Sequence, residues 1–258
     1  MKIGFRTAGF REWPLQRALQ ELARLGYDAV ELCLEHPDMR PERLGEAEAA
    51  ALAEMVRGLG LEIASVSYHG DTDEAQQRLT NQSRSIALTA AMGCDLLILN
   101  TPRQAAGTEP EQWHDLVLWV EGSLLPEAER FGVRLAFEPE PGLVLHGLRE
   151  MLQLLSHLTH PLLGVNLDLG HAWLTDESVP DTVRQLAPWL WHVHFEDFPH
   201  GEHRHLPPGE GDMPLGEIHA ALQQAGYAGA YTIDLFNITD DPVGHAATSL
   251  AATRSVLS

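Results

Sequence analysis

Lysine is almost absent from this chain, since only Lys2 among its 258 residues is a lysine. Lys2 opens the first apolar run, and in parallel barrels the beginning of a strand lies opposite the catalytic face. A Schiff base or a pyridoxal phosphate site would therefore depend on a badly placed amine. The sequence also contains no GxxxxGK[ST] loop and no GxGxxG turn, so no motif indicates nucleotide chemistry.

Basic residues are scarce as a group. Lys and Arg number 17 against 37 Asp and Glu, which gives a formal charge of −20. A phosphate backbone would be repelled over most of such a surface, so we expect no nucleic acid partner.

Long apolar runs and cysteines are also scarce. No stretch approaches the roughly 20 apolar residues of a membrane span, and the N-terminus lacks the apolar core of a signal peptide. The two cysteines, Cys33 and Cys94, lie in apolar segments, which is typical of buried thiols in a reducing compartment. We therefore expect a soluble cytoplasmic protein without a membrane partner, and a homo-oligomer is left open.

Eight short apolar runs alternate with longer amphipathic stretches. The runs are rich in Val, Ile, Leu and Phe and too short for helices, as expected of buried parallel strands. They are Lys2–Arg6, Ala29–Leu34, Glu62–Ser67, Leu96–Asn100, Arg134–Glu138, Leu163–Asp168, Leu190–His194 and Ala230–Leu235. The helical patterns cover Leu15–Leu25, Leu44–Leu59, Ala75–Met92, Trp113–Phe131, Leu148–Leu158, Asp181–Ala187, Leu215–Ala225 and His245–Leu257. Eight such units predict an α/β fold, a single-domain (β/α)8 TIM barrel over residues 1–258, rather than an open doubly wound sheet.

Polar residues lie at or next to the ends of the last four runs. They are Glu138, Asp168, His194 and Asp234, and the carboxyl ends of barrel strands form the catalytic face. Three carboxylates on one rim would repel one another without a cation, and these residue types are ordinary ligands of divalent metals. We therefore expect one divalent ion, Mn²⁺ first, with Mg²⁺, Co²⁺ or Zn²⁺ also compatible with these ligands. The competing interpretation is that these residues form separate ion pairs with arginines or are ordinary turn residues at strand ends.

Further polar residues lie near the same rim. His69 and Asn100 follow or end two other runs, and His171 comes three residues after the sixth run. We expect these three side chains to contact substrate. His192 precedes His194 by two residues and shares its face of the strand, one layer deeper, which is more typical of a core residue than of a ligand.

Five segments together resemble a known family. They are Phe137-Glu138, Asp168-Leu-Gly-His171, His192-Val-His194-Phe-Glu-Asp197, Pro208-Gly-Glu-Gly-Asp212 and Gly229-Ala-Tyr-Thr-Ile-Asp234-Leu-Phe. In this order and spacing they make the chain similar to the xylose isomerase-like TIM barrels, the superfamily of D-tagatose 3-epimerase, inosose isomerase, hydroxypyruvate isomerase and endonuclease IV. The resemblance implies that Glu138, Asp168, His194 and Asp234 are metal ligands. It also implies that His171 lies beside the substrate.

The chain departs from the family pattern at several positions. Asp234 stands where the epimerases usually have glutamate, and His205 occupies a loop position that often holds a substrate-binding arginine. We expect His205 to contact substrate. His200, His203 and His205 lie in the same glycine- and proline-rich loop, and for at least two of them the alternative is a solvated loop. Asn100 and His203 replace two zinc ligands of endonuclease IV, so a three-zinc cluster is incomplete, and a second metal at His203 and His205 is left open.

The resemblance and the residues together favour a metal-dependent isomerase or epimerase of a small ketose, inosose or related hydroxy-ketone. Glu138 and Asp234 would move the proton next to the carbonyl, through a metal-stabilised enediolate. A dehydratase of a polyhydroxy ketone would share that deprotonation. An endonuclease IV-like phosphodiesterase or a non-catalytic sugar-binding barrel could also be built on this fold. The expected partner is a small carbohydrate, and few basic residues beyond Arg6 and Arg103 are placed to hold a phosphate.

Overall fold

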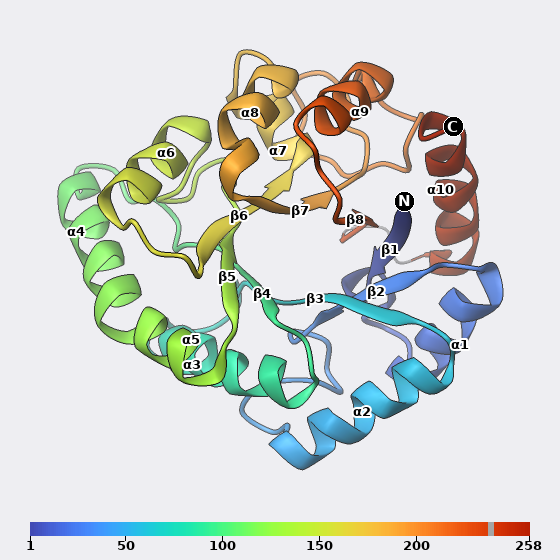
Figure 1. Cartoon of the computed structure of the whole chain (residues 1–258), viewed down its shortest axis with the longest axis horizontal. Coiled ribbons are helices and arrows are strands. Elements are labelled where there is room, and N and C mark those ends of the chain that lie inside the picture. Colours follow the sequence, from blue (N-terminus) through green and yellow to red (C-terminus); the bar gives the residue numbers. More distant parts are fainter. Residues whose placement is uncertain (237–239) are drawn as a thin grey trace.

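Eight parallel strands form a closed barrel in the computed structural model, which describes residues 1–236 and 240–258 (Figure 1). Their order around the barrel follows the chain, and β1 pairs with β8 to close the ring. The predicted (β/α)8 barrel is confirmed, and the open doubly wound sheet is excluded. The strands are β1 (Lys2–Arg6), β2 (Ala29–Cys33), β3 (Glu62–Tyr68), β4 (Leu96–Leu99), β5 (Arg134–Phe137), β6 (Leu163–Asp168), β7 (Leu190–His194) and β8 (Ala230–Ile233).

Helices form the outer layer around the strands (Figure 1). They are α1 (Leu15–Leu25), α2 (Glu46–Gly58), α3 (Ala75–Ala91), α4 (Glu109–Trp119), α5 (Leu125–Phe131), α6 (Leu148–His157), α7 (Leu169–Thr175), α8 (Val179–Leu186), α9 (Leu215–Gln224) and α10 (Pro242–Val256). Three short segments complete the set: the 3-10 turns η1 (Thr7–Phe10) and η3 (Ala187–Trp189), and the π-helical η2 (Val120–Leu124). Within the described ranges, none of the helices combines the length and the apolar character that crossing a bilayer requires.

Two helical predictions were wrong. The continuous helix expected over Trp113–Phe131 is divided into α4 and α5 by the π-helical η2. Pro126 stands in the first turn of α5, and its missing N–H and its ring disrupt the regular hydrogen bonds to the preceding turn. The second error is α7, which was not predicted because it is a short helix directly after β6, where Asp168 caps it by accepting a hydrogen bond from the N–H of His171.

The inside of the barrel is unusually polar. Barrel interiors are typically filled by Val, Ile and Leu, but here Glu31, Ser65, Asn166 and His192 point inward and are at most 1% exposed. Ser65 Oγ donates to Glu31 Oε2 at 2.8 Å, and Asn166 Nδ2 donates to Glu138 Oε2 at 2.7 Å. Because buried polar groups require partners, these contacts join neighbouring strands beneath the carboxyl ends and fix the residues above them.

Gly170 in α7 lies where a side chain does not fit. A Cβ atom at this position would overlap the ring of Phe198, which is fully buried and contacts the ring of His171. The close approach of backbone and ring explains the glycine in the Asp-Leu-Gly-His segment.

Gly170→Ala should therefore lower the free energy of unfolding by about 1–3 kcal/mol, the usual cost of overpacking a closed core. Urea denaturation measures it. Gly216→Ala is the matched control, because Gly216 lies in α9 with no atom within 4 Å of an added Cβ, and it should be neutral or slightly stabilising. Equal stability of the two variants would contradict the packing argument.

Candidate functional site

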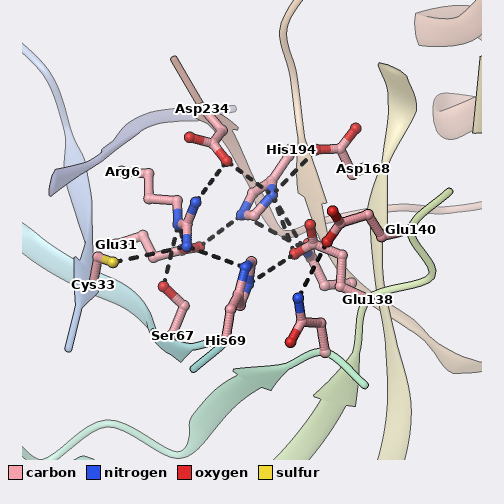
Figure 2. Close-up of polar contacts among 12 residues, drawn as sticks. Arg6, Glu31, Cys33, Ser67, His69, Glu138, Glu140, Asp168, His194 and Asp234 are labelled. Atoms are coloured by element: carbon pink, nitrogen blue, oxygen red, sulfur yellow. Dashed lines mark hydrogen bonds and ion pairs between the residues drawn. The ribbon is translucent and has the colours of Figure 1, made fainter. Parts of the chain in front are cut away.

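Four polar side chains meet at the carboxyl ends of β5 to β8. His194 Nδ1 lies 3.4 Å from Glu138 Oε2, 3.6 Å from Asp168 Oδ2 and 3.8 Å from Asp234 Oδ2 (Figure 2). All four residues are at most 2% exposed. The structure thus brings together the four strand-end residues that the sequence singled out, and it does so around a single imidazole nitrogen. We call these four residues the central cluster.

The other nitrogen of His194 is held from below. His194 Nε2 lies 3.0 Å from Glu31 Oε2, and His192 Nε2 lies 3.3 Å from the same oxygen. Burial raises the pKa of Glu31, but His194, His192 and Arg6 together lower it by more, to well below its ordinary value. Glu31 is therefore a carboxylate that directs His194 Nδ1 toward the central cluster, as carboxylates do for metal-binding histidines. His192 lies one layer deeper, as expected.

Arg6 forms a buried ion pair with the central cluster. Its Nη1 lies 2.8 Å from Asp234 Oδ2, and its Nε lies 2.9 Å from Glu31 Oε1. Arg6 is 2% exposed, so both contacts are shielded from water. Within residues 1–236 and 240–258, no arginine or lysine lies within 4.0 Å of Glu138 or Asp168. Separate arginine pairs therefore account for Asp234 but not for the other two carboxylates.

Several atoms around the central cluster have no hydrogen-bond partner in the described structure. They include Asp168 Oδ2, Asp234 Oδ1 and His171 Nδ1, although buried polar atoms are normally paired. The ligand atoms of Glu138, Asp168 and His194 lie within 4.8 Å of one another, as do those of Asp168, His205 and Asp234. Oxygen donors with one or two imidazole nitrogens suit a divalent cation, so the donor set fits the metal that the sequence predicted.

Three histidines cover the central cluster. His171 Nδ1 lies 3.5 Å from Glu138 Oε1, and its Nε2 lies 3.1 Å from His203 Nε2. Burial lowers the pKa of His171 to about 4, so its ring is neutral at pH 7. His205 Nδ1 donates to the backbone oxygen of Asp234 at 3.1 Å. His171 and His205 are thus placed beside the central cluster, whereas His203 is an exposed residue in contact with His171.

His69 and Asn100 have different positions. His69 Nε2 lies 3.5 Å from Glu138 Oε2. Burial and Arg6 lower the pKa of His69, but nearby carboxylates, mainly Glu138, raise it to about 9. Asn100 lies next to Glu140, because its Nδ2 donates to Glu140 Oε2 at 3.1 Å, and its Oδ1 accepts from Arg78 Nη2.

Several residues of the site were not predicted from the sequence. Glu31 was detectable as a charge inside an apolar run, and Glu140 and Glu196 each lie two residues beyond a predicted ligand. Glu196 is fully buried and accepts a hydrogen bond from the N–H of Gly170 at 3.1 Å. Burial raises its pKa well above the ordinary value, and the adjacent Asp168 adds to this. The spacing of two residues from a predicted ligand was the signal that could have identified Glu140 and Glu196.

Arg6→Met should destabilise the metal-free protein by about 3–5 kcal/mol, because it removes the arginine partner of two buried carboxylates, Glu31 and Asp234. Urea unfolding after chelation measures this. Arg184→Met is the control, since Arg184 pairs with Asp181 on the surface and such pairs contribute at most about 1 kcal/mol. If both variants lost the same free energy of unfolding, the buried ion pairs of Arg6 would contribute no more to stability than a surface pair.

Comparisons with known proteins agree with this architecture. Among curated proteins, fructoselysine 3-epimerase of Shigella flexneri is 24% identical over 277 residues, covering 100% of this chain and 98% of that protein. A crystal structure of D-psicose 3-epimerase in the presence of D-fructose superposes with a TM-score of 0.80 at 20% identity, covering 100% of this chain and 99% of that one. The IOLI protein with a zinc atom bound superposes with a TM-score of 0.81 at 18% identity, covering 100% and 98%. The sequence profile of the family described as xylose isomerase-like TIM barrel matches residues 19–256, and the chain therefore belongs to this family.

Proposed function

We propose that the protein is a divalent-metal-dependent isomerase or epimerase of a small ketose, inosose or related hydroxy-ketone. The observation that carries the proposal is the central cluster, in which three buried carboxylates surround His194 Nδ1 and, among the described residues, only Asp234 has an arginine partner. The likeness to fructoselysine 3-epimerase and to D-psicose 3-epimerase supports a sugar as the substrate.

Glu138, Asp168, His194 and Asp234 would hold the metal. A divalent cation bound there supplies a Lewis acid that polarises the substrate carbonyl. The oxygen-rich donor set favours Mn²⁺, while the zinc in the related IOLI structure supports Zn²⁺ as a second candidate. Glu31 would keep His194 in its orientation for binding.

Glu138 and Asp234 would move the proton. Burial raises the pKa of Glu138, but His194 and His69 lower it by more, well below its ordinary value, so this side chain is an ionised acceptor. In the proposed step Glu138 takes the proton from the carbon next to the carbonyl, and the C–H electron pair passes into the enediolate. Asp234 would take up a proton from solvent and deliver it to the opposite face, which gives the epimer, and Glu138 would then lose its proton to solvent, so that both carboxylates are restored.

The neighbouring histidines would position the substrate. His171 has a neutral ring beside Glu138, and His205 is anchored through Nδ1 to the backbone of Asp234. Imidazole nitrogens in these positions suit hydroxyl groups as hydrogen-bond donors or acceptors. His69, on the other side of Glu138, would help to hold that carboxylate in place.

A dehydratase of a polyhydroxy ketone is the second candidate, because it begins with the same proton removal by Glu138 and then expels a hydroxide as water. An endonuclease IV-like reaction is disfavoured by the formal charge of −20 and by Asn100, which contacts Arg78 and Glu140 instead of the central cluster. A non-catalytic barrel would not need carboxylates on both sides of the substrate.

His194→Ala should abolish metal binding, since it removes the nitrogen at the middle of the central cluster. We expect about one Mn²⁺ per parent chain and a small fraction of that in the variant, measured by elemental analysis after dialysis. His157→Ala is the matched control, because His157 is exposed on α6. Full occupancy in His194→Ala would overturn the metal assignment.

Glu138→Gln should lower kcat by about 10²-fold or more, the usual contribution of a positioned general base, while it retains appreciable metal. The measurement is deuterium incorporation from solvent next to the ketose carbonyl, followed by NMR with metal content determined in parallel. Asp234→Asn should behave alike, and Glu129→Gln, an exposed residue paired with His160, serves as control. Exchange at the parent rate in both metal-loaded site variants would rule out these two bases.

A further inference from the structure

Three side chains form a hydrogen-bonded group on the rim beside the central cluster. Arg78 comes from the first turn of α3, Asn100 directly follows β4, and Glu140 lies two residues beyond Glu138 after β5. Arg78 Nη2 donates to Asn100 Oδ1, and Asn100 Nδ2 donates to Glu140 Oε2 at 3.1 Å. We call Arg78, Asn100 and Glu140 the rim triad.

The rim triad fixes the direction of Glu140. Because Arg78 occupies the amide oxygen of Asn100, the amide nitrogen must face the carboxylates, and it also lies 3.4 Å from Asp71 Oδ1. This leaves Glu140 Oε1 with no hydrogen bond in the part of the chain that the structure describes. Figure 2 shows Glu140 beside Glu138 at the site. Glu140 Oε1 is therefore an oriented acceptor next to the proposed base.

Arg78 is itself incompletely paired. It is 8% exposed, and its Nε has no hydrogen-bond partner among the described residues. Burial lowers the pKa of Arg78, and the carboxyl groups of Asp71, Glu35 and Glu140 offset part of this decrease. Arg78 Nη1 lies 4.0 Å from Asp71 Oδ1, and Asn100 Nδ2 is shared between Asp71 and Glu140, so a phosphate group placed here would meet two acidic side chains. A neutral hydroxyl would instead donate to Glu140 and complete the group.

From these contacts we infer that the rim triad is the subsite for the end of the substrate remote from its carbonyl, and that Glu140 selects free polyhydroxy ketoses over ketose phosphates. The inference rests on the proposed function and narrows its substrate class. Glu140 lies two residues beyond Glu138 across Pro139, and Figure 2 shows both side chains at the site, so a substrate whose reacting carbons face Glu138 can place another hydroxyl within reach of Glu140. Arg103, an exposed residue bridged to Leu143 in the same loop region, is the competing candidate for contacting a phosphate.

The test uses the full-length, Mn²⁺-loaded protein and deuterium incorporation from solvent into three ketoses: dihydroxyacetone, D-fructose and D-fructose 6-phosphate. Dihydroxyacetone has no remote end and reports the chemistry alone. In Glu140→Ala the ratio of kcat/KM for fructose to that for dihydroxyacetone should fall about 10-fold, through KM, as expected for loss of one hydrogen bond. Glu140→Gln should raise the use of fructose 6-phosphate relative to fructose.

Circular dichroism and metal content establish that both variants are folded and loaded, and Arg103→Ala is the matched control that should keep the parent preference for fructose. An unchanged fructose to dihydroxyacetone ratio in Glu140→Ala overturns the inference. So does a parent preference for fructose 6-phosphate over fructose, and loss of that preference in Arg103→Ala would assign the phosphate contact to Arg103. A parent protein that exchanges none of the three ketoses overturns the proposed function and this inference with it, whereas exchange with unaltered selectivity overturns only the inference.

Discussion

Closure of the barrel between β1 and β8 is the constraint on which the site depends. The pairing runs from Lys2 opposite Ala230 to Phe5 opposite Ile233, and it places Arg6 within 2.8 Å of Asp234 although 228 positions separate them in the chain. Arg6 also reaches Glu31, whose second oxygen holds His194. The first and last strands therefore control the orientation of an imidazole on the seventh, and in an open sheet this chain of contacts would not exist.

Charge balance is the second constraint. Burial alone would raise the pKa of every carboxyl group in the barrel, yet the pKa values of Glu31, Glu138 and Asp168 all lie below their ordinary values because imidazoles oppose the effect. Without a metal, His194 carries much of this compensation, since the carboxylates raise its pKa well above the usual value despite burial. A cation at the centre would take over that role and free the imidazole to bind as a neutral ligand.

The sequence predicted the fold and the meeting of four residues for a simple reason: in a parallel barrel the carboxyl ends of all strands lie on one face, so position in the strand is enough. The partners of these residues depend on side-chain direction across the barrel, which periodicity does not specify. Glu31 lies mid-strand and contacts His194 on a distant strand. Asn100 stays a predicted substrate contact from its strand-end position, but its hydrogen bond to Arg78, on a helix outside the barrel, could not be read from that position. The family resemblance indicated the candidate metal ligands. It did not indicate the contact of Glu31 with His194 or that of Arg78 with Asn100.

The single lysine has a practical consequence. Lys2 pairs with Glu62 at the start of the first strand, where its side chain is 57% exposed, while Arg6 at the other end of the same strand faces the central cluster. An amine-reactive reagent therefore finds its one ε-amino group on the face of the barrel opposite the site. Covalent attachment to a solid support through Lys2 would orient the molecules alike, with the carboxyl ends of the strands turned toward the solution.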